Sequence, residues 1–231
     1  MRSISASLTV FIWTFFFAFS AVAAISAKDS KQLKALDLKY QKAKAVAAKV
    51  DKTLKIGLLG EERKSNGNVW ISKGRVRMEL EGNEKSLLVV NKSNLWAVNY
   101  PGPEFPDAPV QVIKGNAGSK KGQEKNMMSL LTVGGFLKFF DAKSTETRNG
   151  GEKVFTLMPK KGAKTDFKRA QVAIAADGKS ISQIKYWDQR DNETEFNFRD
   201  VKFDGKEAFG KKFEDKLFDF SPPAGAEVMN I

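Results

Sequence analysis

Apolar residues alternate with other residues along most of the chain, and this period of two constrains the fold more than any other feature. The alternation begins at Val46 and continues, with interruptions, to Phe203. Turn-forming pairs such as Asn66-Gly67, Asn149-Gly150 and Asp177-Gly178 separate the alternating segments. Alternation of this kind predicts β-strands with one buried face, and the intervening pairs predict hairpins between successive strands.

About eleven strands are predicted in this way, together with two helical segments. Leu33, Leu36 and Tyr40 recur at steps of three and four, which predicts a helix over 29–44. A second helical segment is predicted over 126–140, with a break at its glycine pair. Sequential hairpins favour one antiparallel sheet, whose apolar face the helices must cover. The expected fold class is therefore mainly β (α+β): one strongly curved sheet forming an incomplete barrel under helical lid segments.

The N-terminal residues have the pattern of a signal peptide. Arg2 supplies a positive charge, residues 8–19 are uncharged, and Ala21-Val22-Ala23 fits a small-x-small cleavage site. A membrane-spanning helix needs about 20 apolar residues, and this run is shorter. We expect residues 1–23 to be removed after export and residues 24–231 to fold as one domain. An uncleaved membrane anchor is the alternative.

The sequence contains neither histidine nor cysteine. Serine–histidine–aspartate triads, cysteine–histidine pairs and the usual zinc sites therefore cannot be built. The stretch from Asp177 to Ser180 lacks the earlier glycine of a phosphate-binding loop, and the acidic residues 188–193 lack the spacing of a calcium loop. We expect no enzyme activity, no metal and no cofactor.

The net charge is +12, and basic proteins bind nucleic acids, anionic membranes or acidic partners. The export signal argues against nucleic acid. Lysines are spread along the chain, which favours ordinary solvated surfaces. Weak attraction to anionic lipid headgroups is the alternative.

Five stretches of the sequence together match the segments of a known protein family. They include strand-like segments and a proline-containing segment near the C-terminus. In chain order they are Gly67-Asn68-Val69-Trp70-Ile71, Gly74-Arg75-Val76-Arg77-Met78-Glu79, Leu87-Leu88-Val89-Val90 followed by Leu95-Trp96, Phe155-Thr156-Leu157-Met158-Pro159-Lys160, and Phe218-Asp219-Phe220-Ser221-Pro222-Pro223-Ala224-Gly225-Ala226-Glu227-Val228. In their order and spacing, these stretches resemble the LolA family of outer-membrane lipoprotein carriers.

The resemblance implies an eleven-stranded half-barrel with a helical lid over an apolar cavity. It also implies a monomeric periplasmic carrier that takes lipoproteins from an inner-membrane ABC-type complex and passes them to an outer-membrane receptor. That receptor resembles the carrier but is itself lipidated on a cysteine, which this chain lacks. An envelope lipid-binding or sensor module without transfer activity, built on the same fold, remains the alternative.

Two groups of residues follow as candidates for the site. In the family an arginine is thought to hold the lid closed, and the matching positions here are Ser72-Lys73, so Lys73 or Arg75 is the candidate substitute. Acyl chains gain about 0.8 kcal/mol per buried CH₂, so the cavity must be lined by apolar side chains. The candidates for the lining, chosen by alternation, are Val76, Met78, Leu80, Leu88, Val90, Trp96, Leu131 and Phe136.

Overall fold

The computed structural model describes residues 25–117, 135–163, 165 and 167–230. Within these residues, no helix combines the length and the apolar character needed to span a membrane. The elements in chain order are α1 (Ala27–Lys42), β1 (Val46–Ile56), β2 (Glu61–Ser72), β3 (Arg75–Gly82), β4 (Ser86–Val90), β5 (Asn94–Asn99), β6 (Gln111–Asn116), the 3-10 helix η1 (Phe136–Lys138), β7 (Phe140–Thr147), β8 (Lys153–Pro159), β9 (Phe167–Ile174), β10 (Ile181–Asp188), β11 (Glu193–Phe203), β12 (Glu207–Ala208), β13 (Lys211–Lys212), the 3-10 helix η2 (Asp215–Phe218) and β14 (Glu227–Asn230).

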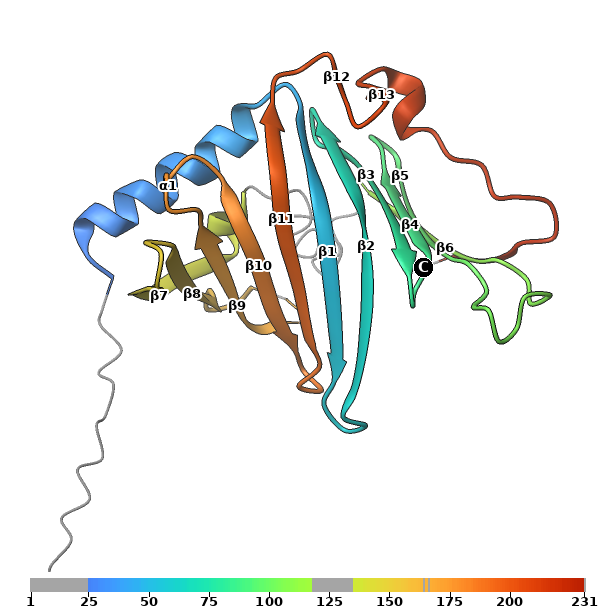
Figure 1. Ribbon diagram of the computed structural model, residues 1–231, viewed down its shortest axis with the longest axis horizontal. Helices are drawn as coiled ribbons and strands as arrows, with labels where there is room; N and C mark the ends of the chain where they lie inside the picture. The colour runs from blue at the N-terminus through green and yellow to red at the C-terminus, as the bar shows by residue number, and fades with distance from the viewer. Residues whose placement is uncertain (1–24, 118–134, 164, 166, 231) are drawn as a thin grey trace, which may run out of the picture.

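Twelve strands form a single curved sheet in the order β14-β6-β5-β4-β3-β2-β1-β11-β10-β9-β8-β7 (Figure 1). The outermost strands, β14 and β7, do not pair with each other, so the sheet is not closed. The prediction of a mainly β fold built on one large sheet is confirmed. The antiparallel arrangement is confirmed for the sheet as a whole. The sheet has twelve strands where about eleven were predicted, because the C-terminal residues return beside β6 and pair with it in parallel.

The predicted turn at Asn66-Gly67 is wrong, because both residues lie inside β2. Strands β1 and β2 pair along their full length, from Val46 with Ile71 to Ile56 with Glu61. A Cβ atom added at Gly67 would lie 1.8 Å from the carbonyl oxygen of Glu79. The glycine therefore permits a close approach between two backbones and does not form a hairpin turn. By contrast, Asn149-Gly150 and Asp177-Gly178 do connect strands.

Helix α1 begins two residues earlier than predicted, where the Ser26 hydroxyl accepts a hydrogen bond from the backbone N–H of Asp29 at 3.0 Å. Its apolar side carries Leu33, Leu36 and Tyr40, all buried. The backbone N–H of Ile181 donates to the Tyr40 hydroxyl at 2.9 Å, which ties the helix to β10. We call the sheet face on which α1 packs the inner face.

The second predicted helix does not extend to 140. Residues 126–134 lie outside the described residues. After them, Gly135 adopts a left-handed conformation with φ of 74°, η1 makes a single 3-10 turn, and β7 begins at Phe140. Within the described residues, α1 is thus the one long helix, and the predicted helical lid is not matched.

The opposite, outer face of the sheet is covered in part by the C-terminal segment. Trp70 packs there with Leu217 and Phe218, and the Trp70 indole donates to the backbone carbonyl of Ala208 at 2.9 Å. Further along the sheet, Trp96 contacts Phe220 with a centroid separation of 5.6 Å. The sheet therefore buries apolar residues on both faces, whereas the alternation predicted one face in water.

Candidate functional site

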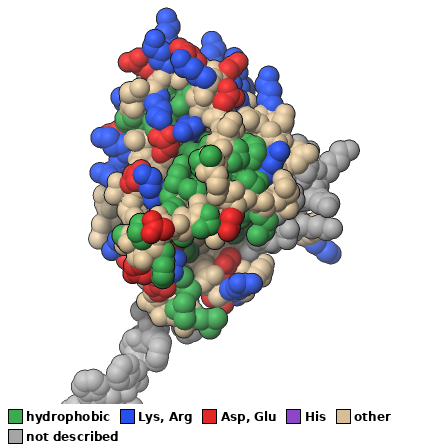
Figure 2. Space-filling view, turned by 90° about the vertical axis from the view of Figure 1, so that its right-hand side faces the viewer, with side chains coloured by type: hydrophobic (Ala, Val, Ile, Leu, Met, Phe, Trp, Pro, Cys, Tyr) green, Lys and Arg blue, Asp and Glu red, His purple; other side chains and the backbone are tan. Residues whose placement is uncertain are grey.

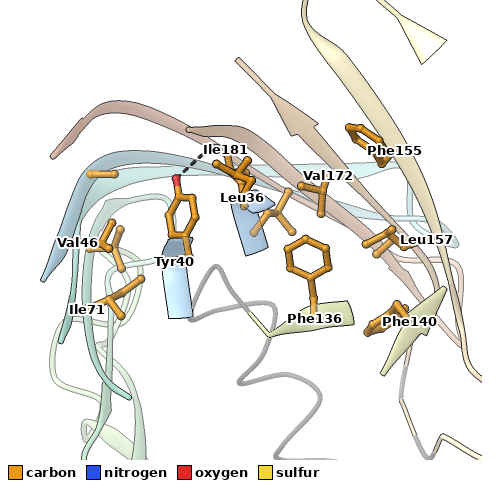
Figure 3. Packing of buried hydrophobic residues seen from close by; sticks show 14 of the residues in the cluster. Leu36, Tyr40, Val46, Ile71, Phe136, Phe140, Phe155, Leu157, Val172 and Ile181 are labelled. Atoms are coloured by element: carbon orange, nitrogen blue, oxygen red, sulfur yellow. Dashed lines mark hydrogen bonds between the residues drawn. The ribbon is translucent and has the colours of Figure 1, made fainter. Parts of the chain in front are cut away.

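The inner face of β7–β10 is a solid core. Phe136 of η1 lies beneath Leu36 and beside Phe140 and Leu157, as Figure 3 shows. Phe136 and Leu157 are 0% exposed, and Phe140 is 1% exposed. Side chains so tightly enclosed stabilise the fold and leave no room for a ligand at this place.

The inner face of β3–β6 differs, because one row of apolar side chains there is only half-buried. Met78 pairs with Leu88, Leu88 with Ala97, and Ala97 with Ile113, so these four residues lie side by side across four strands. All four are half-buried. We call Met78, Leu88, Ala97 and Ile113 the inner row. It presents aliphatic surface in a continuous row across the sheet, which suits an extended hydrocarbon chain.

The inner row lies between a buried apolar row and a charged cluster. On one side, Val76, Val90 and Leu95 are buried in the core. On the other side, beyond the buried Leu80, Lys52 forms an ion pair with Glu84 at 2.8 Å.

Arg63 also pairs with Glu84, at 3.1 Å. Burial favours a raised pKa for the Glu84 carboxyl, but the hydrogen bonds from Lys52 and Arg63 outweigh burial and hold the pKa below its usual value. These charges mark an end of the apolar surface, since a hydrocarbon chain would displace their water without replacing it.

Five of the eight predicted lining residues share the inner face of neighbouring strands. They are Val76, Met78, Leu80, Leu88 and Val90. Leu131 lies outside the described residues. Phe136 is fully buried in the core of the inner face and has no exposed surface of its own.

Trp96 was assigned to the wrong face. It packs on the outer face with Val89, Val98 and Phe220, and Leu95 takes the inner position in β5. The segment from Leu95 to Val98 is apolar throughout, so alternation could not tell which residues point inward.

The lid latch at Lys73 or Arg75 stays a prediction, because most of the predicted lid segment lies outside the described residues. Arg75 donates to the Asp215 carboxylate at 2.5 Å, and its guanidinium lies 4.5 Å from the centre of the Phe218 ring. Both partners belong to η2, so Arg75 holds the C-terminal segment on the outer face. Lys73 is exposed in the β2–β3 turn with φ of 51°.

A buried carboxylate that the sequence analysis missed joins α1 to η1. Asp37 is 4% exposed, and it accepts hydrogen bonds from the backbone N–H of Gly135 and, at 2.8 Å, from the Gln41 amide. Burial raises the pKa of the Asp37 carboxyl, although these hydrogen bonds oppose the shift. In the sequence, this role was indicated only by the position of Asp37 on the same side of the helix as Leu33, Leu36 and Tyr40.

Replacing Asp37 by asparagine should change how stability depends on pH. The folded-state pKa of Asp37 lies above its ordinary value of 3.8, so the folded protein holds this proton more tightly than the unfolded chain. The stability due to protonation is full below pH 3.8 and is lost as pH rises through the raised pKa. Asp37→Asn keeps an acceptor oxygen and cannot ionise. In thermal unfolding from about pH 4 to pH 8, the melting temperature of the variant minus that of the wild type should increase with pH. A difference in melting temperature that stays constant over this pH range would contradict a raised pKa of Asp37.

Comparison with known proteins assigns the family. A model of the outer membrane lipoprotein carrier protein LolA matches residues 41–221, which is most of the chain. The chain belongs to the LolA family. This match spans the strands that carry the inner row and extends to the segment on the outer face. No curated protein matches this chain.

Solved structures with a similar fold are distant in sequence. An uncharacterised conserved protein from Thermus thermophilus is 12% identical, with a TM-score of 0.47 over 87% of this chain and 99% of that one. A LolA superfamily protein from Nitrosomonas europaea is 11% identical, with a TM-score of 0.41 over 85% and 99%. The Mycobacterium tuberculosis lipoprotein LppX is 17% identical, with a TM-score of 0.35 over 78% and 98%.

Proposed function

We propose that this LolA-family chain is a periplasmic carrier that holds the acyl chains of lipoproteins on the inner row and delivers them to the outer membrane. In this proposal an inner-membrane ABC-type complex supplies the lipoprotein and an outer-membrane receptor accepts it. Membership of the LolA family is the observation that carries the proposal. The half-buried inner row supports it, because its four side chains keep part of their aliphatic surface exposed, where an acyl chain can bind.

Release of the cargo also follows from partial burial of the inner row. Each CH₂ group removed from water contributes about 0.8 kcal/mol, so a fully enclosed acyl chain would be held too tightly to leave without an energy source. An apolar surface that ends at the Lys52–Glu84 pair binds less of the acyl chain. An acceptor with a more complete apolar site would then draw the lipoprotein away.

An envelope module that binds lipid and transfers nothing is the second candidate. It would use the same inner row, so binding measurements alone cannot separate the two functions. The difference lies in whether bound lipoprotein moves on to an acceptor.

Transfer from inner-membrane vesicles separates these candidates. Labelled lipoprotein would be incubated in such vesicles with the ABC-type complex, ATP and the purified chain, and the soluble complex would then be mixed with outer membranes. The carrier proposal expects a soluble complex whose label moves to the outer membranes. A soluble complex that keeps its label would favour the sensor module, and the absence of any soluble complex would refute both.

A further inference from the structure

The turn between β1 and β2 carries two adjacent leucines in water. Leu58 is 91% exposed and Leu59 is 72% exposed. The hairpin extends beyond its neighbours and forms the lowest part of the sheet in Figure 1. Figure 2 keeps the same vertical axis and shows hydrophobic side chains at the lower end of the protein. We call residues 57–60 the hairpin tip.

The hairpin tip does not need leucines in order to fold. The backbone N–H groups of Leu59 and Gly60 both donate to the carbonyl of Ile56, at 3.1 and 2.9 Å. The N–H of Gly57 donates to the Asn192 side chain at 3.3 Å, which fixes the tip against the β10–β11 turn. Backbone contacts therefore define the turn. Polar residues usually occupy exposed turns, so the two leucines indicate an apolar partner.

The charges around the hairpin tip compensate one another. Each neighbouring lysine or arginine on β1 and β2 has an acidic partner, so the protein surface around the tip carries little net charge. The long lysine and arginine stems can lie along an apolar surface while their charged ends stay in water. The pairs are Arg63 with Glu61 at 2.7 Å, Lys64 with Glu62 at 2.8 Å, and Lys55 with Glu193 at 3.5 Å.

We propose that the hairpin tip docks the protein on a lipid bilayer, with Leu58 and Leu59 entering the boundary between headgroups and acyl chains. A bilayer accepts backbone only where its polar groups are already bonded, and the bonds to Ile56 satisfy two of them at the tip. A projecting aliphatic tip needs no matching groove and suits a deformable surface. The paired charges predict that binding depends little on the charge of the lipid.

This docking site is distinct from the inner row and is tested without cargo. The chain has no cysteine, so Leu58→Cys gives one attachment point for an environment-sensitive fluorophore. With phosphatidylcholine vesicles brominated in their acyl chains, the probe should shift to the blue and be quenched. A probe at Leu38→Cys on α1, where the native leucine is 46% exposed, is the matched control and should do neither. Equal responses at the two positions, or no response at Leu58→Cys, would overturn the proposal.

Vesicle co-sedimentation tests the unlabelled protein. Removing an aliphatic side chain of this size from a lipid environment lowers a partition coefficient by roughly tenfold or more. We expect Leu58→Ser with Leu59→Ser to lower partitioning into phosphatidylcholine by at least about tenfold, and Leu38→Ser to leave it unchanged. Because all three positions are exposed, thermal unfolding should be unaltered. Wild-type binding that persists in the double variant, or that requires anionic lipid, would overturn the proposal.

Discussion

Replacing both Met78 and Leu88 by glutamate is expected to weaken binding of a triacylated lipopeptide by at least about 100-fold. These residues face each other across β3 and β4 at one end of the inner row. An acyl chain lying on them would cover two carboxylates and remove their water, and uncompensated burial of charge is costly. Titration of a fluorescent lipopeptide would measure the affinity.

The same experiment needs a control for added negative charge. Met158 on β8 is 37% exposed and points away from the inner face, because its neighbour Leu157 points into the core, so Met158→Glu adds a carboxylate away from the inner row and should bind as the wild type does. Circular dichroism should show that the Met78→Glu, Leu88→Glu protein keeps its sheet, because both positions are only half-buried. A folded double variant with unchanged affinity would place the acyl chains elsewhere.

Phe136→Ala is expected to lower the free energy of unfolding by about 3–5 kcal/mol. Phe136 is 0% exposed and packs against residues of α1 and the sheet, so its removal leaves a cavity in a solid core (Figure 3). Domains are stable by only about 5–15 kcal/mol, so this loss is large. Urea unfolding followed by tryptophan fluorescence would measure it.

The neighbouring residue supplies the control for Phe136. Leu137 is half-buried, so Leu137→Ala should cost less than Phe136→Ala. This comparison also decides between two roles for Phe136. If Phe136 lined a ligand cavity, as the sequence suggested, its truncation would cost about as little as that of Leu137, and lipopeptide affinity would fall instead.

The sequence predicted the sheet well where polar and apolar residues alternate strictly. In β3, Val76, Met78 and Leu80 are separated by charged residues, and all three face inward as predicted. The prediction failed for Trp96, because β5 is apolar on both faces and the pattern gave no direction. The outer face of β5 is apolar because the C-terminal segment covers it, through contacts such as that of Trp96 with Phe220. Contacts between segments so distant in the chain leave no local pattern.

Two further failures have local causes. Asn66-Gly67 is a common turn pair, yet here the glycine meets a spatial demand from the β3 backbone that only the folded sheet reveals. Asp37 lies within an apolar helix face, and its role depends on the backbone N–H of Gly135, nearly 100 residues away in the sequence. The sequence pattern did not show that Leu58 and Leu59 are exposed, because Leu58 continues the alternation of Leu54 and Ile56.

Photo-crosslinking from the acyl chain is the most direct test of the claim that lipid lies on the inner row. A triacylated lipopeptide with a diazirine in one acyl chain would be bound, irradiated and mapped by mass spectrometry of the digested protein. The account predicts labels on inner-row residues of β3, β4 and β6, namely Met78, Leu88 and Ile113. Labels confined to the outer face, at Trp96 or Phe220, would contradict it.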